Sequence, residues 1–431
     1  MTEDARHFKT ELAIIGSGIA GFAASIFALN RQLDCAQIGN TGAVAYTTGY
    51  LDLLGKTEDN EGAFKNTHDN PWDGLKQLRT THANHPLSQI PQADIEEGFK
   101  QFTAFLGECG IAYTSPGVNN ITALTPVGTL KKTLCLPATM AAGPKAFAAK
   151  KKCVIIDFKG LKGFSGRQVV ANLIDQWPAL STQRVSFPEM LSGEIYPEVM
   201  ARALEVPATR VKLAELLKTA AGEAKIIGLP AVLGMHSPDT VRTELERLAG
   251  LEIFEIPTMP PSVPGIRLRE MFEQVFPQKG VTLIPQQKVT SLTFNDQGAQ
   301  LSLADNYGPI TIDTQAVILA TGRFLSGGLE AHIEGIEEPL LGLPVTQPAD
   351  RTSWYHEKYT GPTGHAIHKT GIEVDSSFRP LASDGTPFDE RLFAAGIILA
   401  HQDWIRGRSG AGIAIATAYK AVEAVEKFLR A

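Results

Sequence analysis

The sequence predicts an α/β fold in which both ends of the chain build one domain and the middle of the chain forms an inserted region. An apolar run at residues 11–15 is followed at once by a glycine-rich turn and an apolar helical segment. Apolar, strand-like runs return at 313–320 and 392–396, and the last helical segment covers 410–429. Alternation of short apolar strands with helices is typical of proteins with a parallel sheet.

The chain length indicates more than one domain. The 431 residues exceed the ~100–200 residues of one ordinary domain, so we expect two domains. We assign residues 1–100 and 311–431 to the first domain and residues 101–310 to the inserted region. Hydrophobic residues make up 43% of the chain and charged residues 20%, which excludes disorder as its main state.

Charge and the N-terminal residues limit the classes of partner. The formal net charge is -6, whereas a general nucleic-acid binder needs a clustered basic face, so nucleic acid is not an expected partner. We find no run of the ~20 apolar residues that a membrane span needs. The start, Met1-Thr2-Glu3-Asp4-Ala5-Arg6-His7, carries acids and is unlike a secretory signal. We therefore expect a cytoplasmic protein without a membrane span of its own.

The cysteines are spaced too widely for a metal centre. They are Cys35, Cys109, Cys135 and Cys153, and none forms a Cys-x-x-Cys pair. We therefore expect no iron–sulfur cluster and no zinc ion held by closely spaced thiolates, and interpret the cysteines as small core residues in a reducing compartment. Electrons that leave this chain would pass from an organic cofactor to another subunit or to a diffusible acceptor.

The clearest motif follows the first strand. Strand 11–15, the turn Gly16-Ser17-Gly18-Ile19-Ala20-Gly21, helix 22–29 and strand 35–38 stand in the order of a dinucleotide-binding unit. A glycine turn at a helix start lets backbone amides approach a pyrophosphate, and the helix N-terminus adds partial positive charge. The predicted domain is therefore Rossmann-like, of the FAD/NAD(P)-binding, two-dinucleotide-binding type. We assign cofactor binding to Gly16, Ser17, Gly18, Ala20 and Gly21.

One residue of the usual dinucleotide site is missing. An acid at the end of the second strand normally binds the adenosine ribose, but this sequence has Gly39-Asn40 there. Asn40 can donate to a ribose hydroxyl, but it cannot act as the charged acceptor. This departure is compatible with FAD in an unusual adenosine pocket, with FMN, or with a shortened cofactor. It disfavours an enzyme that uses NAD alone.

Small residues after the second strand are candidates for the ring side of a flavin. Thr47, Thr48 and Gly49 would let backbone amides reach the flavin N5 edge, where hydrogen bonding tunes hydride acceptance. An ordinary loop with a helix cap at Thr47 or Thr48 is an equal alternative.

The C-terminal part of the chain offers three further backbone approaches. Gly410, Ala411, Gly412 and Ile413 open the last helix, whose N-terminus would stabilise negative charge at the flavin N1/O2 region. Thr321 and Gly322 follow one apolar strand, and Gly396 ends another. Glycine-marked elements in this order are more specific than any one of them.

The inserted region has a mixed pattern. We expect a strand near 154–157 and helices near 167–176, 210–221 and 240–248, followed by a stiff, proline-rich link at 257–265. We expect this α+β region to close over the cofactor as a cap.

Several longer motifs resemble one family as a set. The chain resembles the B subunits of anaerobic glycerol-3-phosphate dehydrogenases and, more widely, the flavoproteins related to fumarate reductase and succinate dehydrogenase. The segments that carry this resemblance are Gly16–Gly21, Thr47–Leu54, Pro126–Lys131, Gly228–Gly234, Pro260–Leu268 and Gly410–Ala414. The string Pro-Pro-Ser-Val-Pro-Gly-Ile-Arg-Leu at 260–268 is the most specific of them.

The resemblance implies a function and partners. It implies a part in oxidising sn-glycerol 3-phosphate, a small phosphorylated substrate, to dihydroxyacetone phosphate, with electrons passed to the quinone pool. It also implies a separate FAD-bearing subunit and an iron–sulfur subunit that meets the membrane, which would hold this chain peripherally at the inner face of the cell membrane. The family's B subunits are described as using FMN. The missing ribose acid agrees with FMN and the glycine turn favours a dinucleotide, so the choice between FAD and FMN stays open.

Oxidation of a secondary alcohol needs a base and, for this substrate, cations for the phosphate. We select His401 and His365 as bases, because the pKa of a histidine lies near neutrality, and Arg323 and Arg267 as the cations. The alternative for each is an ordinary structural or surface role. Two other functions stay open: a fumarate-reductase-like oxidoreductase for another small substrate, and an electron-transfer or scaffold subunit that turns over no substrate.

Overall fold

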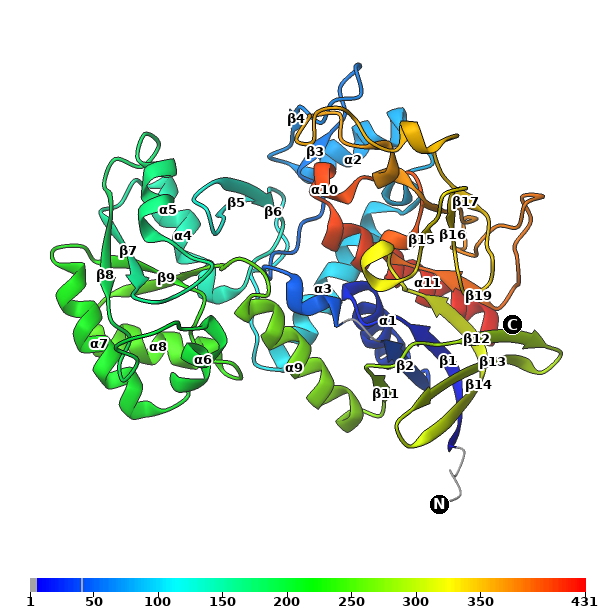
Figure 1. Cartoon of the computed structure of the whole chain (residues 1–431), viewed down its shortest axis with the longest axis horizontal. Coiled ribbons are helices and arrows are strands. Elements are labelled where there is room, and N and C mark those ends of the chain that lie inside the picture. Colours follow the sequence, from blue (N-terminus) through cyan, green and yellow to red (C-terminus); the bar gives the residue numbers. More distant parts are fainter. Residues whose placement is uncertain (1–5, 40–41) are drawn as a thin grey trace. The chain divides into compact units, whose positions relative to one another are not determined.

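The computed structural model describes residues 6–39 and 42–431, and its chain divides into two compact units. Unit 1 consists of Met1–Ala43, Asp52–Phe102 and Phe272–Ala431, and unit 2 of Val44–Leu51 and Thr103–Met271. Figure 1 labels the elements of both, and each unit is described by itself. Within the described residues, no helix is long and apolar enough to cross a membrane.

Unit 1 is built on a seven-stranded sheet with the order β11-β2-β1-β14-β13-β12, in which β19 also pairs with β14. The strands are β1 (Arg6–Ile15), β2 (Cys35–Gly39), β11 (Thr282–Pro285), β12 (Ser291–Asn295), β13 (Gly298–Asp305), β14 (Gly308–Leu319) and β19 (Leu392–Ala394). β11, β2, β1, β14 and β19 are parallel, whereas β12, β13 and β14 form an antiparallel meander. The apolar ends of the two central strands, β1 and β14, are fully buried.

Two apolar helices pack together in unit 1. α1 (Ile19–Asn30) and α11 (Gly410–Leu429) are rich in alanine and buried along most of their length, so their backbones approach closely. On α1, Phe22 stacks on Phe272 with ring centroids 4.3 Å apart. The remaining elements are α2 (Pro71–Thr81), α10 (Trp404–Gly407) and the short pairs β3 (Lys56–Thr57) with β4 (Asn66–Thr67), β15 (Glu330–Ala331) with β16 (Ile336–Glu337), and β17 (Val345–Thr346) with β18 (Gly371–Ile372).

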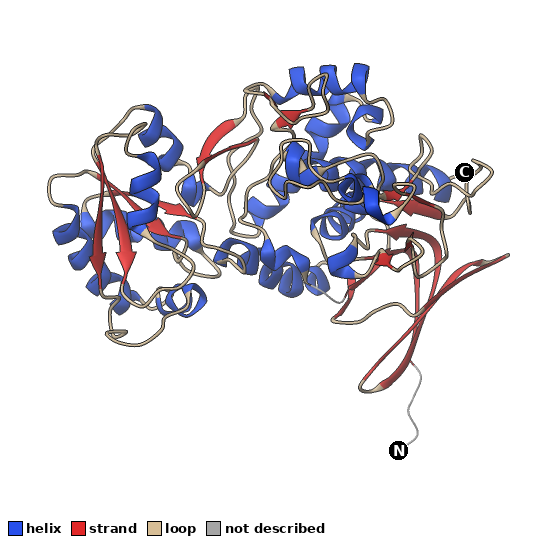
Figure 2. Ribbon diagram, turned by 45° about the horizontal axis from the view of Figure 1, so that its top comes forward, coloured by secondary structure: helices blue, strands red, loops and turns tan. Residues whose placement is uncertain are grey.

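Unit 2 contains a parallel sheet of its own with the strand order β10-β9-β7-β8. Its strands are β7 (Cys153–Phe158), β8 (Leu180–Val185), β9 (Ile226–Pro230) and β10 (Glu252–Ile256), and its helices are α4 (Ala142–Ala148), α5 (Gly166–Leu173), α6 (Pro197–Ala203), α7 (Pro207–Ala221) and α8 (Pro238–Ala249). Strands and helices alternate along the chain and lie in layers in Figure 2. An antiparallel hairpin, β5 (Ile121–Leu124) with β6 (Leu130–Thr133), completes the unit. α3 (Gln92–Glu108) and α9 (Val263–Gln278) contribute residues to both units.

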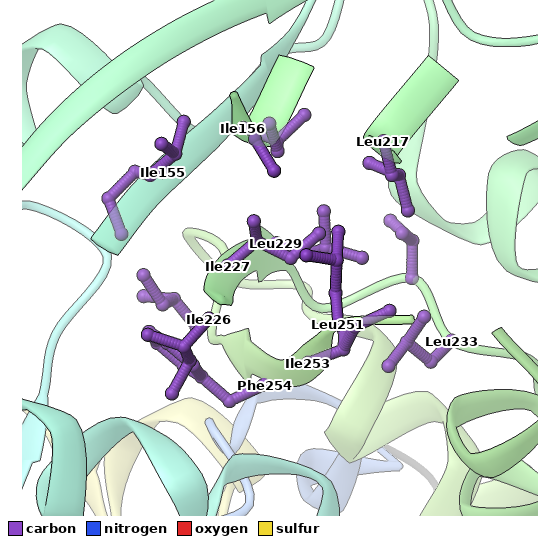
Figure 3. Close-up of a cluster of buried hydrophobic side chains, with 14 of the residues drawn as sticks. Ile155, Ile156, Leu217, Ile226, Ile227, Leu229, Leu233, Leu251, Ile253 and Phe254 are labelled. Carbon is purple, nitrogen blue, oxygen red and sulfur yellow. The ribbon is translucent and has the colours of Figure 1, made fainter. Parts of the chain in front are cut away.

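The core of unit 2 lies between this sheet and its helices. Side chains of β7, β9 and β10 meet Leu217 of α7 in one apolar cluster (Figure 3). Ile155, Ile227 and Phe254 are fully buried there. Strands buried on both faces read as continuous apolar runs, which is the pattern expected of a parallel sheet between helices.

The structure divides the chain differently from the sequence prediction at three places, the smallest being residues 101–102, which were assigned to the inserted region and lie in unit 1. Residues 272–310, assigned to the inserted region, lie in unit 1, because β11 pairs with β2 and β13 pairs with β14. Residues 44–51, assigned to the first domain, lie in unit 2. The predicted α+β insertion is in the main an interleaved α/β sheet, and only the β5–β6 pair is antiparallel among the described strands of that unit. That this region covers the cofactor stays a prediction.

Candidate functional site

The parallel strands of unit 1 end at one edge of the sheet. The register pairs Ile15 of β1 with Ile38 of β2 and with Leu319 of β14, which in turn pairs with Ala394 of β19. A glycine lies within three residues of each of these strand ends. These glycines are Gly16, Gly39, Gly322 and Gly396. In open α/β sheets this carboxyl edge is where ligands bind.

The glycine turn after β1 is held by close backbone contacts. A Cβ on Gly16, whose φ is +145°, would lie 2.1 Å from the carbonyl oxygen of Ala320, and a Cβ on Gly21 would lie 2.1 Å from the carbonyl oxygen of Gly16. The buried amide of Gln37 donates to Gly16 O (2.9 Å) and accepts from the Ser25 hydroxyl (3.0 Å). Gln37 thus joins β2, the turn and α1. Sequence reasoning missed Gln37, although a glutamine inside an apolar strand is an unusual residue.

Gly18 differs from its two glycine neighbours in the turn. A Cβ built on Gly18 meets no atom within 4 Å. Gly18 is the N-cap of α1, which has no side-chain cap and no acid in its first turn. The amides at this helix start therefore have no side-chain acceptor from a cap, and the open space at Gly18 lets a ligand approach the backbone.

The absence of the ribose-binding acid at the end of β2 has a steric explanation. A Cβ on Gly39 would lie 2.5 Å from Cβ and Oγ of Ser17, so a side chain at 39 would collide with the phosphate turn. Ser17 Oγ instead accepts from the backbone N–H of Gly42 (3.2 Å). Asn40, the predicted substitute for the acid, lies outside the described residues.

Two further strand ends adjoin the turn. Gly396 has φ at +83° and leaves no space for a side chain, because a Cβ there would lie 2.7 Å from Cβ of Ala20. The N–H of Gly396 donates to Thr417 Oγ1 of α11 (2.8 Å). After β14, the buried hydroxyl of Thr321 has no partner in the part of the chain that the structure describes. A buried hydroxyl without a partner at this edge fits a polar ligand atom.

The N-terminus of α11 lies against the segment that follows Leu51. The N–H of Gly412 donates to Asp52 O (2.7 Å), and a Cβ on Gly412 would lie 2.4 Å from the carbonyl oxygen of Leu53. Ala411 and Ile413 are buried, and α11 runs along α1. The structure therefore brings α11, which residues 410–413 open, together with the glycine-turn helix α1 inside unit 1.

The predicted N5-edge residues belong to unit 2. Ser262 Oγ donates to the carbonyl oxygen of Thr47 (2.8 Å), and the N–H of Gly49 donates to Thr47 Oγ1 (3.2 Å). Gly49 has φ at +86° and would place a Cβ 2.9 Å from Cβ of Pro264. The proline-rich link thus fixes this loop. Whether Thr47, Thr48 and Gly49 meet the elements of unit 1 around one flavin stays a prediction.

Arg267 is committed to a buried ion pair in unit 2. Its two terminal nitrogens donate to the two carboxylate oxygens of Glu255, each at 2.8 Å, and its Nε donates to Gly234 O (2.7 Å). Both side chains are 2% exposed or less. Burial alone would raise the pKa of Glu255, but Arg267 and two other donors hold it below its ordinary value. This geometry supports a structural role for Arg267 and gives no support to the predicted phosphate contact.

Arg323 is equally engaged, in unit 1. Its guanidinium donates to the backbone oxygens of His368, Leu399 (3.1 Å) and Gln402 (3.2 Å). Burial lowers its pKa to about 10. Arg323 therefore ties the loop after β14 to the segment that carries His401. This geometry supports a positioning role, and the predicted contact with substrate stays a prediction.

The candidate bases differ in how far their ring nitrogens are occupied. Nδ1 of buried His365 accepts from His356 N (2.9 Å) and its Nε2 lies 3.0 Å from Tyr359 O, so both nitrogens serve the loop around them. His401 has a half-exposed ring, φ at +63°, and Nε2 at 3.0 Å from Glu373 Oε1. His401 lines a pocket, but a carboxylate already contacts its ring.

Replacing Arg323 tests its positioning role. Arg323→Met removes a charged donor from three backbone oxygens, of which Leu399 O keeps a bond from the side-chain amide of Gln402. We expect a loss of about 2 kcal/mol in unfolding free energy, since bonds from a charged donor are worth ~1.5–3 kcal/mol. Hydrogen exchange should accelerate at 397–403. Exposed Arg351, which donates to one carbonyl oxygen, is the matched control as Arg351→Met. Unchanged exchange at 397–403 would refute the role.

Comparison with known proteins is consistent with this site. Residues 11–413 match the protein family described as FAD binding domain. The chain is 28% identical to the B subunit of anaerobic glycerol-3-phosphate dehydrogenase from Aliivibrio fischeri, over 96% of this chain and 94% of that protein. It is 29% identical to the protein of the same name from Vibrio cholerae, over 96% of each chain. Among solved structures, it is similar to a 3-ketosteroid-delta4-(5alpha)-dehydrogenase of Rhodococcus jostii, with 11% identity, a TM-score of 0.42 and coverage of 99% and 98%.

Proposed function

Because this chain belongs to the FAD binding domain family, we propose that the carboxyl edge of the unit 1 sheet is its FAD site and that the chain works as a flavin-dependent oxidoreductase. The observation that carries the proposal is the cradle formed there by backbone alone. Side-chain bulk is excluded by contact at Gly16 and Gly396, while a Cβ on Gly18 would stand in open space. This arrangement suits a ligand that is gripped by amides.

Each part of the cradle has a role in the proposal. Gly18 and the first turn of α1 hold the pyrophosphate, with Ser17, Ala20 and Gly21 shaping the turn. Thr321 and Gly322 approach the cofactor from β14. Gly410, Ala411, Gly412 and Ile413 aim a helix N-terminus at the ring, where partial positive charge stabilises its reduced form. When bound, FAD supplies a hydride acceptor.

The relatives suggest the substrate and the complex. We propose that the chain is a subunit of a glycerol-3-phosphate dehydrogenase and takes part in the oxidation of sn-glycerol 3-phosphate to dihydroxyacetone phosphate, with electrons delivered to quinone. Its partners would be a second FAD-bearing subunit and an iron–sulfur subunit at the membrane. Contact with that iron–sulfur protein would place the chain at the inner membrane face.

A second candidate function is supported by the state of the predicted catalytic residues. Arg267, Arg323 and His365 are all bonded to other parts of the chain. A subunit that binds flavin and relays electrons needs no base and no phosphate contact. The relay is therefore the alternative to direct oxidation.

Reduction of the bound flavin by substrate separates the two functions. The purified chain should be yellow, and the released cofactor should have the mass of FAD. If this chain oxidises the substrate, anaerobic sn-glycerol 3-phosphate bleaches the flavin band of the isolated chain. Bleaching that requires the partner subunits supports the relay. A chain that takes up no flavin, even when FAD is added, would refute both functions.

A further inference from the structure

A pocket in unit 1 adjoins the segment that contacts the N-terminus of α11. Its wall includes Lys56, Glu58, His82, His85, Lys369 and His401, and its cavity, of about 20 Å³, opens to solvent. Gly407 and Ser409, which immediately precede α11, also line it. Five of these six side chains carry nitrogen, and the wall also includes the two carboxylates of Glu58 and Asp403.

His85 presents an uncharged donor on a largely buried ring. The ring is 7% exposed, and its Nδ1 accepts a bond from the backbone N–H of Leu87 (3.1 Å). Burial, with the nearby charges of His82 and Lys369, lowers its pKa to about 3, so the ring is neutral at pH 7. The ring proton is therefore on Nε2. Within residues 6–39 and 42–431, no protein acceptor bonds to this Nε2, so its N–H is available to a ligand in the pocket.

Lys56 presents a second donor, and this one is charged. The described residues include no carboxylate paired with its ammonium group. Burial lowers its pKa, and so do the neighbouring charges of Arg408 and Arg406. Because the Lys56 ammonium group lies near two other cations and has no carboxylate partner, binding of an anion would lower its electrostatic energy.

The carboxylate of Glu58, the single acid among these six residues, already has two partners. The two carboxylate oxygens of Glu58 contact Lys369 Nζ at 2.5 Å and His82 Nε2 at 3.0 Å. Elsewhere in the wall, Asp403 is bonded to His368 (3.2 Å) and His401 to Glu373 (3.0 Å). The donors that remain are Lys56 Nζ and His85 Nε2.

We propose that this pocket is an anion subsite that takes the phosphate group of a small phosphate monoester, with Lys56 and His85 as its donors. Lysine binds phosphate as a point charge, and a neutral histidine adds a directional N–H. The identification of the monoester with glycerol 3-phosphate rests on the proposed function. The subsite itself rests on the pocket.

Binding, measured apart from turnover, tests the subsite. The flavin-loaded chain is titrated calorimetrically with sn-glycerol 3-phosphate, inorganic phosphate and glycerol. We expect both phosphates to bind and glycerol not to bind. Lys56→Met should raise both dissociation constants by roughly tenfold or more, since a charge-assisted bond is lost, and Lys56→Arg should restore most of the affinity. Lys76→Met removes an exposed charge from α2 and should bind like the unaltered chain.

The outcomes separate the subsite from the proposed function. The subsite is wrong if neither phosphate binds, or if Lys56→Met binds both as tightly as the unaltered chain, even when glycerol 3-phosphate bleaches the flavin. If binding depends on Lys56 but the substrate never bleaches the flavin, alone or with partners, the subsite stands and the proposed substrate falls. Binding of inorganic phosphate with no binding of glycerol 3-phosphate supports the subsite for a different ester.

Discussion

Gly18→Ala is expected to give a folded protein that no longer holds FAD. The added Cβ meets no protein atom within 4 Å, so the fold loses little, but it occupies the space through which the pyrophosphate would approach the amides of α1. Loss of two charge-assisted bonds at ~1.5–3 kcal/mol each weakens FAD binding by roughly a hundredfold or more. Flavin fluorescence titration of the apo-protein gives the affinity, and urea unfolding gives the stability.

Two other glycines act as controls for Gly18→Ala. Gly16→Ala forces a Cβ against the carbonyl oxygen of Ala320 at a backbone angle that disfavours side chains, so we expect loss of stability together with loss of flavin. Gly107→Ala also meets no atom within 4 Å and belongs to unit 2, so it should change neither property. Normal FAD affinity in Gly18→Ala would show that the pyrophosphate does not bind at this turn.

Arg267→Met is expected to be the most destabilising substitution in unit 2. It leaves the carboxylate of Glu255 buried without its cation, and breaking a buried pair in this way costs about 3–5 kcal/mol. The midpoint of urea unfolding of the variant should therefore shift strongly to lower urea concentration. Arg247→Met, which removes an exposed arginine from α8 in the same unit, should leave the unfolding free energy nearly unchanged. Equal stability of the two variants would contradict the importance of the ion pair.

The pH dependence of the unfolding free energy provides an independent test, because we expect it to have opposite signs in the unaltered chain and in Arg267→Met. In the unaltered chain the folded pKa of Glu255 lies below its ordinary value of 4.5, so its contribution is present above 4.5 and is lost as the pH falls through the folded pKa. In Arg267→Met, burial becomes the leading effect and raises the pKa of Glu255. The stability of that variant should therefore fall as the pH rises above 4.5. A variant whose stability still rises over this range would show that another cation compensates Glu255.

The parts of the fold that local sequence encodes were predictable. The glycine turn behind an apolar strand, the alanine-rich helix after it and the last helix from Gly410 are specified by residues adjacent in the chain, and the structure has them at the predicted places. Local periodicity also indicated α7 and α8. The family match confirms the predicted FAD-binding fold.

The rest depends on contacts between distant residues, which one sequence does not display. Nothing near Arg267 marks Glu255 as its buried partner, and the sequence makes Arg267 look like a free cation beside a rigid link. The boundary at Phe272 follows from the pairing of β11 with β2, and strand pairing is not visible in composition. The pocket that His85 and Lys56 both line is formed by the fold, and their positions in the sequence do not indicate it.

The pairing of β1 with β14 also bears on how the chain is made. Ile15 and Leu319 are neighbours in the sheet but stand about 300 residues apart in the chain, a separation that slows folding. At a synthesis rate of ~5–20 residues per second, β1 waits roughly 15–60 s on the ribosome for this partner. Until then, one edge of an apolar strand is open to other nascent chains. We therefore expect this unpaired edge of the central strand to be a site where the nascent chain is prone to aggregate.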